Sequence, residues 1–187
     1  MLSYFDLRKG KKFILEGQPY EVLEFQQMYK AQDMVVAKTK LRNLITGRVH
    51  EKNFHQGDTF EEAELEKIEI KFLYSNRGKF CFSEIQNSAK RFELEEEQIG
   101  EWTKFLKLNQ ILTGIKFQDK FINIVLPIKI QLKVTEAPPG IKGDRAQGGT
   151  KTVTLETGAN INVPLFVEQG DIVEVNTETG EYVRRME

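Results

Sequence analysis

A period-two alternation of apolar and polar residues is the feature that most constrains the fold of this chain. Ile128, Ile130, Leu132 and Val134 alternate with Lys129, Gln131 and Lys133. Because successive side chains of a β-strand point to opposite faces, this pattern predicts a strand with one face in a core. Similar patterns occur in residues 68–74, 80–82 and 172–175. The sequence therefore predicts a mainly β fold.

Glycine-containing turns separate these strands at short intervals. They occur in residues 16–19, 46–47, 76–78 and 177–180 and favour hairpins of short strands. The clearest helix candidate is "EEEQIGEWTKFLK", residues 95–107, in which acidic residues occupy the first turn. Its residues Ile99, Trp102, Phe105 and Leu106 are spaced for one apolar helical face. We expect this helix to close the end of a barrel.

Two interruptions divide the strand pattern into thirds. One is the acidic stretch 59–69, and the other is the segment 125–130, which contains a proline. We therefore predict three small β domains, at residues 1–62, 63–127 and 128–187. Domains of this size are weakly stable alone, so neighbouring domains should pack together or form a rigid row.

The charge and the cysteine and histidine content exclude several classes of protein. A formal net charge of -1 gives the whole chain no long-range attraction to nucleic acid or membrane. The single cysteine, Cys81, excludes an internal disulfide, and His50 and His55 alone provide no set of soft metal ligands. No apolar run reaches the roughly 18 residues of a membrane span. We expect a cytoplasmic protein with no metal and no cofactor.

The first third is the only basic one, with ten Lys and Arg against seven Asp and Glu in residues 1–60. Alternation places Val35, Ala37, Thr39 and Leu41 on one side of a strand. The other side carries Lys38, Lys40 and Arg42, with Arg48 shortly beyond the turn. Such a row of cations can follow a sugar-phosphate backbone. The alternative is an ordinary solvated strand face.

A second candidate for phosphate contact is the loop "EAPPGIKGDRAQGGTK", residues 136–151. Its glycines leave backbone amides available to phosphates, and Lys142, Arg145 and Lys151 supply positive charge. The loop lacks the order of a nucleotide-binding P-loop and has no helix after it, so a simple flexible connector is the alternative.

Catalytic residues are not evident in the sequence. His50 and His55 are five positions apart on a strand-like segment, so alternation places them on opposite faces. Cys81 lies between two phenylalanines and has no histidine nearby in sequence, which favours a small strand residue over a nucleophile. The carboxylates at positions 95–97 suit a helix N-terminus better than an acid/base pair. We do not expect an enzyme.

One family resemblance covers almost the whole chain. The segment "TKTVTLETGANINVPLFVEQGDIVEVNTETGEYVRR" resembles the C-terminal signature of bacterial translation elongation factor P, with Val153 where that family usually has alanine. "DLRKGKKFILEGQPYEVLEFQ" is similar to the opening hairpin of that family, and "AKTKLRNLITGRVHEKNF" to the strands after its functional turn.

The resemblance implies an L-shaped, tRNA-like row of one KOW/SH3-like domain and two OB-folds. It also implies a monomeric factor that binds ribosomal RNA and peptidyl-tRNA, between the peptidyl-tRNA and exit-tRNA sites. Such factors help peptide bonds to form at consecutive prolines. Tyr182 and Arg185 resemble family residues that are needed for activity.

The hairpin tip departs from the family pattern. Lys30, Ala31, Gln32 and Asp33 align with the usual Pro-Gly-Lys-Gly, so Gln32 replaces the lysine that is commonly modified and that approaches the acceptor end of peptidyl-tRNA. Glutamine accepts no such modification and carries no charge. Either Gln32 acts unmodified with Lys30 supplying the charge, or Lys30 is the reaching residue.

Two other functions fit the same features. One is a diverged paralogue that binds ribosomes but has lost or narrowed its polyproline activity. The other is a free RNA-binding protein that uses its OB barrels.

Overall fold

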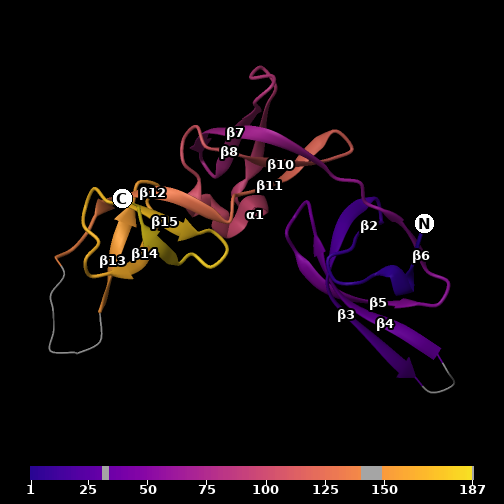
Figure 1. Cartoon of the computed structure of the whole chain (residues 1–187). Coiled ribbons are helices and arrows are strands. Elements are labelled where there is room, and N and C mark those ends of the chain that lie inside the picture. The colour runs from indigo at the N-terminus through magenta and orange to yellow at the C-terminus, as the bar shows by residue number, and fades with distance from the viewer. Residues whose placement is uncertain (31–33, 140–148, 187) are drawn as a thin grey trace.

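The chain forms three antiparallel sheets arranged in a bent row (Figure 1). A computed structural model describes residues 1–30, 34–139 and 149–186. The strands of the three sheets occupy residues 2–62, 66–125 and 129–185. The predicted mainly β class is therefore confirmed.

The first sheet has six strands in the order β1-β6-β2-β3-β4-β5. These are β1 (Leu2–Ser3), β2 (Lys12–Leu15), β3 (Gln18–Lys30), β4 (Met34–Asn43), β5 (Val49–His55) and β6 (Thr59–Glu62). A short 3₁₀ turn, η1 (Tyr4–Asp6), lies between β1 and β2 in the chain. The strands enclose a small core of Tyr4, Leu7, Phe13, Val22, Ala37, Leu41 and Phe54.

The second and third sheets share one topology. The second contains β7 (Glu66–Asn76), β8 (Lys79–Glu84), β9 (Arg91–Glu95), β10 (Ile111–Phe117) and β11 (Lys120–Val125). The third contains β12 (Lys129–Glu136), β13 (Thr150–Leu155), β14 (Asn160–Pro164), β15 (Ile172–Asn176) and β16 (Tyr182–Arg185). In each sheet the first strand lies between the second and the fourth, and the third and fifth strands approach one another. This five-stranded Greek-key arrangement is the OB-fold.

The helix predicted at residues 95–107 is broken into two short turns. An α-helical turn, α1 (Glu96–Ile99), is followed by a 3₁₀ segment, η2 (Gly100–Phe105). Gly100 has a φ of 67°, a conformation that ends an α-helix and that glycine adopts at little cost. Ile99, Phe105 and Leu106 are nevertheless buried in the core, as their spacing predicted.

The alternation predicted most strand faces correctly, with exceptions that include Ile128, Tyr74 and Ile172, the last of which is 46% exposed. Ile130, Leu132 and Val134 are buried, whereas Ile128 precedes β12 and is 57% exposed. Tyr74 is 46% exposed because the register between β7 and β8 shifts between Phe72 and Tyr74. A bulge of this kind places one residue outside the period-two pattern.

The second and third barrels share one hydrophobic core. Two threonine hydroxyls add hydrogen bonds at this junction: Thr157 donates to the Lys104 carbonyl at 2.7 Å, and Thr177 donates to the Pro127 carbonyl at 2.9 Å. The Lys107 ammonium also lies 2.9 Å from the Glu156 carboxylate. Shared apolar packing with satisfied polar groups favours a rigid connection.

The Glu156 contact should make this junction sensitive to acid. Burial raises the pKa of Glu156, but hydrogen bonds from the Lys107 side chain and the Lys133 amide outweigh burial, so its pKa lies below the usual value. Because the pKa of Glu156 is lower in the folded state, its ionised form stabilises the protein at pH values above the unfolded pKa of about 4.3. This stabilisation is lost as the pH falls through the folded-state pKa.

We expect Glu156→Gln to reduce the free energy of unfolding at pH 7 by on the order of 1 kcal/mol. In urea titrations at pH 7 and pH 3, this difference should be smaller at the lower pH, and an equal difference at both values would contradict the assignment.

The residues considered for catalysis are structural or lie on the surface. Cys81 is 4% exposed in β8, and His50 and His55 are both exposed on β5. Within the described residues, no three His, Cys, Asp or Glu side chains gather in a way that could hold a metal ion. No helix in this part of the chain has the length and apolar character needed to cross a membrane.

Candidate functional site

The hairpin of β3 and β4 projects from the first barrel away from the rest of the molecule (Figure 1). Its long strands contain β-branched and aromatic residues, which favour a strand conformation. The two arms stay paired as far as Lys30 and Met34. Of the predicted tip, Lys30 is the last residue of β3, and Ala31, Gln32 and Asp33 lie outside the described residues.

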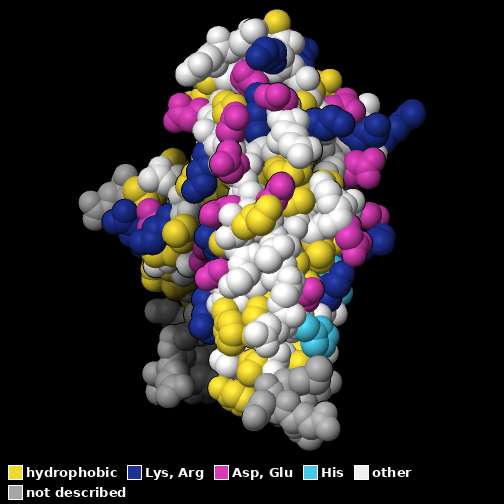
Figure 2. Space-filling model, turned by 90° about the vertical axis from the view of Figure 1, so that its right-hand side faces the viewer, with side chains coloured by type: hydrophobic (Ala, Val, Ile, Leu, Met, Phe, Trp, Pro, Cys, Tyr) yellow, Lys and Arg dark blue, Asp and Glu magenta, His cyan; other side chains and the backbone are white. Residues whose placement is uncertain are grey.

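The predicted basic row lies on the accessible side of β4. Ala37, Thr39 and Leu41 are buried, as the alternation predicted. Each cation has an acidic neighbour from an adjacent strand: Lys38 lies 3.0 Å from Glu51, Lys40 lies 3.3 Å from Glu24, and Arg42 lies 2.5 Å from Glu21. Figure 2 shows one face of the molecule, on which Lys and Arg are interspersed with Asp and Glu. Solvent-exposed pairs are weak, so RNA phosphates could compete for these cations.

A cleft of about 660 Å³ lies beside this row on the first barrel. Its charged lining consists of Arg8, Lys9, Lys38 and Lys40 with Glu24 and Glu51, so cations are in excess. The Arg8 guanidinium stands 4.5 Å from the centre of the Phe25 ring. A cation stacked on an aromatic ring is a surface on which nucleic-acid groups can dock.

The four predicted cations of the first barrel do not form one cluster. Lys38 and Lys40 line the cleft, whereas Arg42 lines a separate cavity of about 790 Å³ between the first and second barrels. Arg48 is exposed just before β5, at the end of β4 opposite the hairpin tip.

Two exposed apolar side chains near the tip were missed by the sequence analysis. Met28 is 45% exposed and Tyr29 is 76% exposed. The Gln27 amide donates a hydrogen bond to the Tyr29 hydroxyl at 3.1 Å. The sequence held one signal for a contact surface here: the segment "QQMYK" contains two large apolar residues and no acidic residue.

The predicted C-terminal contacts are also spread over the third barrel. Lys151 lies on β13, where its ammonium donates to the Pro138 carbonyl at 3.0 Å. Tyr182 and Arg185 lie on β16, which is not a neighbour of β13 in the sheet. Arg185 is 3.5 Å from Asp171 and stacks over the exposed Phe166 ring at 5.4 Å. Lys142 and Arg145 lie outside the described residues.

Comparisons with known proteins match the two ends of the chain to one family. The family described as "Elongation factor P (EF-P) KOW-like domain" matches residues 3–60, and "Elongation factor P, C-terminal" matches residues 130–185. Elongation factor P of Carboxydothermus hydrogenoformans is 40% identical over 100% of both chains. That of Desulforapulum autotrophicum is 41% identical over 100% of this chain and 99% of its own.

A solved structure has a similar fold at low identity. It is "Eukaryotic translation initiation factor 5A from Methanococcus jannaschii", at 13% identity and a TM-score of 0.52, over 66% of this chain and 92% of that one. An SH3-like barrel followed by OB barrels, with these full-length relatives, defines a translation factor. The chain belongs to the elongation factor P family.

Replacing the basic row should weaken ribosome binding in a salt-dependent way. We expect Lys38→Ala, Lys40→Ala and Arg42→Ala together to weaken binding, with each removed cation costing on the order of 1 kcal/mol. The slope of log affinity against log salt should fall as phosphate contacts are lost. Sedimentation binding with purified ribosomes at several salt concentrations measures both values. Unchanged affinity and slope would identify the row as a solvated strand face.

Proposed function

We propose that this protein binds the ribosome between the peptidyl-tRNA and exit-tRNA sites and promotes peptide bond formation at consecutive prolines. It acts as a monomer through domains 1–62, 63–127 and 128–187. The observation that carries the proposal is the β3–β4 hairpin, which projects from a barrel whose cleft has more cations than acids in its lining. The full-length relatives named elongation factor P support the same assignment.

The proposed action is positional. Proline is a constrained, poor nucleophile, and holding the peptidyl-tRNA in a reactive geometry lowers the entropic part of the barrier. The tip, residues 30–33, contacts the acceptor end of the tRNA. Two groups of residues bind RNA. The first barrel contributes the cations Lys38, Lys40, Arg42 and Arg48. The third barrel contributes Lys142, Arg145, Lys151, Arg185 and the aromatic Tyr182. The covalent chemistry remains that of the ribosome.

Ribosome profiling of a strain that lacks the gene tests this function in the cell. Pauses at Pro-Pro codons, removed when the gene is restored, are expected. A diverged paralogue, which the replacement of the usual tip lysine by Gln32 favours, would leave Pro-Pro translation unchanged while still binding ribosomes. Altered abundance of particular RNAs without proline pauses would indicate a free RNA-binding protein.

The tip should act without modification. Because Gln32 lacks the amine that the family modifies, the intact mass of the protein from its native source should equal the mass computed from the sequence, allowing for loss of the initiator methionine. High-resolution mass spectrometry measures this. An added mass that maps to Lys30 would make Lys30 the reaching residue.

A further inference from the structure

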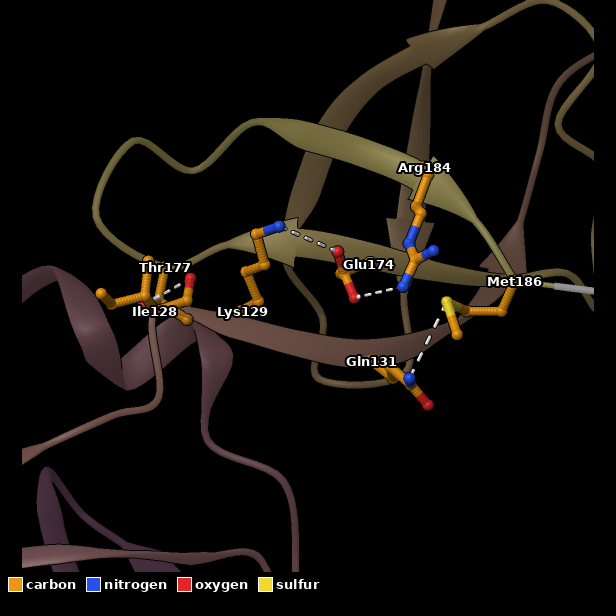
Figure 3. Close-up of polar contacts among 7 residues, drawn as sticks. All are labelled: Ile128, Lys129, Gln131, Glu174, Thr177, Arg184 and Met186. Carbon is orange, nitrogen blue, oxygen red and sulfur yellow. Dashed lines mark hydrogen bonds and ion pairs between the residues drawn. The ribbon is translucent and has the colours of Figure 1, made fainter.

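The outer face of the third barrel carries a buried carboxylate between two accessible cations. Glu174 lies on β15, the strand between β12 and β16. Lys129 on β12 and Arg184 on β16 both point toward it (Figure 3). The Lys129 ammonium is 3.6 Å from Glu174 Oε1, and Arg184 Nη2 is 3.4 Å from Glu174 Oε2.

This carboxylate is poorly satisfied for a group that is so deeply buried. Glu174 is only 7% exposed, and its Oε1 atom has no hydrogen-bond partner among the described residues. The single hydrogen bond to the carboxylate from Arg184 is long, at 3.4 Å. Burying a charge with such weak partners contributes little to stability and often costs free energy. Stability alone is therefore a weak reason for an acid at this position.

The two cations remain available to a ligand. Their side chains are 58% exposed for Lys129 and 63% exposed for Arg184, although each is held at one point by Glu174. The group of three charges has a net positive charge. An ammonium and a planar guanidinium that are both drawn toward one carboxylate suit the oxygens of a phosphate, because restrained side chains lose less entropy on binding than unrestrained ones.

We propose that Glu174 positions Lys129 and Arg184 as a two-cation site for a phosphodiester of RNA. Glu174 is a positioning residue, and the two cations make the contact. The proposal rests on the proposed ribosomal function, since the ribosome presents RNA phosphates to the factor. It adds a contact on the face of β12, β15 and β16 to those expected at Tyr182 and Arg185.

Glu174→Gln tests this site because simple charge attraction and positioning predict opposite results. Removing an acid makes the protein more positive, which by itself strengthens RNA binding. If Glu174 holds the cations in place, Glu174→Gln will instead weaken binding to purified ribosomes at least threefold. The salt slope will fall by about one, as expected for a lost phosphate contact. Unchanged or tighter binding, or an unchanged slope, would overturn the proposal.

Four further variants complete the test, and two of them, Glu181→Gln and Lys79→Ala, are controls. Glu181→Gln removes an exposed acid from the same barrel and should leave binding unchanged or slightly tighter. Lys129→Ala and Arg184→Ala should each weaken binding at least threefold. Lys79→Ala breaks a comparable exposed pair in the second barrel, 3.7 Å from Glu93, and should change binding less than twofold. If Lys129→Ala and Arg184→Ala behaved like Lys79→Ala, the site would not bind ribosomes.

A photo-crosslinking amino acid at Gln131 identifies the ligand. Gln131 is exposed and pairs with Glu174 across the sheet. A crosslink to ribosomal RNA or tRNA is expected, and a crosslink to ribosomal protein alone would overturn the assignment to RNA. Pro-Pro bond formation by the parent protein, measured separately, tests the proposed function. If the parent is active but Glu174→Gln binds as the parent does, this inference alone fails.

Discussion

Changing Lys30 and Gln32 together to alanine should slow Pro-Pro bond formation roughly tenfold or more while leaving ribosome binding nearly intact. We expect this separation because the cations proposed to bind RNA lie on the first and third barrels, whereas the tip is proposed to act on the geometry of the reacting tRNA. An interaction of that kind changes rate more than affinity. Single-turnover synthesis of a Pro-Pro peptide in reconstituted translation gives the rate, and sedimentation gives the binding.

The chain contains a matched control for the tip variant. Gln118 and Lys120 have the same two residue types at the same spacing, at the β10–β11 turn of the second barrel, and both are exposed. Gln118→Ala with Lys120→Ala should leave the rate unchanged. Asp33→Gly should be neutral or helpful, because it removes an acid that repels phosphate. If the double tip variant relieved stalling as well as the parent, the tip would have no part in the rate and a diverged paralogue would be favoured.

Phe82→Ala should cause the largest loss of stability. Phe82 is fully buried in β8, and its ring centre lies 5.4 Å from that of Phe72 and 5.5 Å from that of Phe92. Removing a buried phenyl ring leaves a cavity and costs about 3–5 kcal/mol of unfolding free energy. Trp102, the one tryptophan in the sequence, packs against the same core, so urea titration followed by its fluorescence reports this barrel.

Phe166→Ala is the control for that measurement. Phe166 is 57% exposed on the third barrel, so the same substitution should cost less than about 1 kcal/mol. Because the second and third barrels share one hydrophobic core, Phe82→Ala should also destabilise the third barrel. Equal losses for the two substitutions would contradict the core described here.

The strands could be predicted from the alternation of residue types along the chain. The charged neighbours of each side chain could not, because they depend on the register between paired strands. Alternation placed Ile130, Leu132 and Val134 in the core, but it could not locate the bulge that exposes Tyr74. The row at Lys38 and Lys40 was visible as positive charge. Its acidic neighbours come from other strands and appear only when the strands are paired.

Part of that pairing was available in the sequence. If residues are paired outward from Gln32, Glu24 falls opposite Lys40, as the structure shows. The stacking of Arg8 on Phe25 could not be predicted in this way, because Arg8 lies in the loop before β2 and Phe25 lies within β3. The apolar spacing of residues 95–107 predicted one continuous helix. The positive φ of Gly100 instead ends α1 after one turn, and the spacing gave no sign of this break.

The most direct test of the central claim is Pro-Pro bond formation with the unmodified recombinant protein. Its production in cells that lack the tip-modifying enzymes, followed by an intact-mass check, gives a defined sample. We predict that adding it to reconstituted ribosomes raises the rate of Pro-Pro synthesis roughly tenfold or more and leaves a Phe-Phe control unchanged. An unmodified protein that binds these ribosomes but leaves the Pro-Pro rate unchanged would contradict the account.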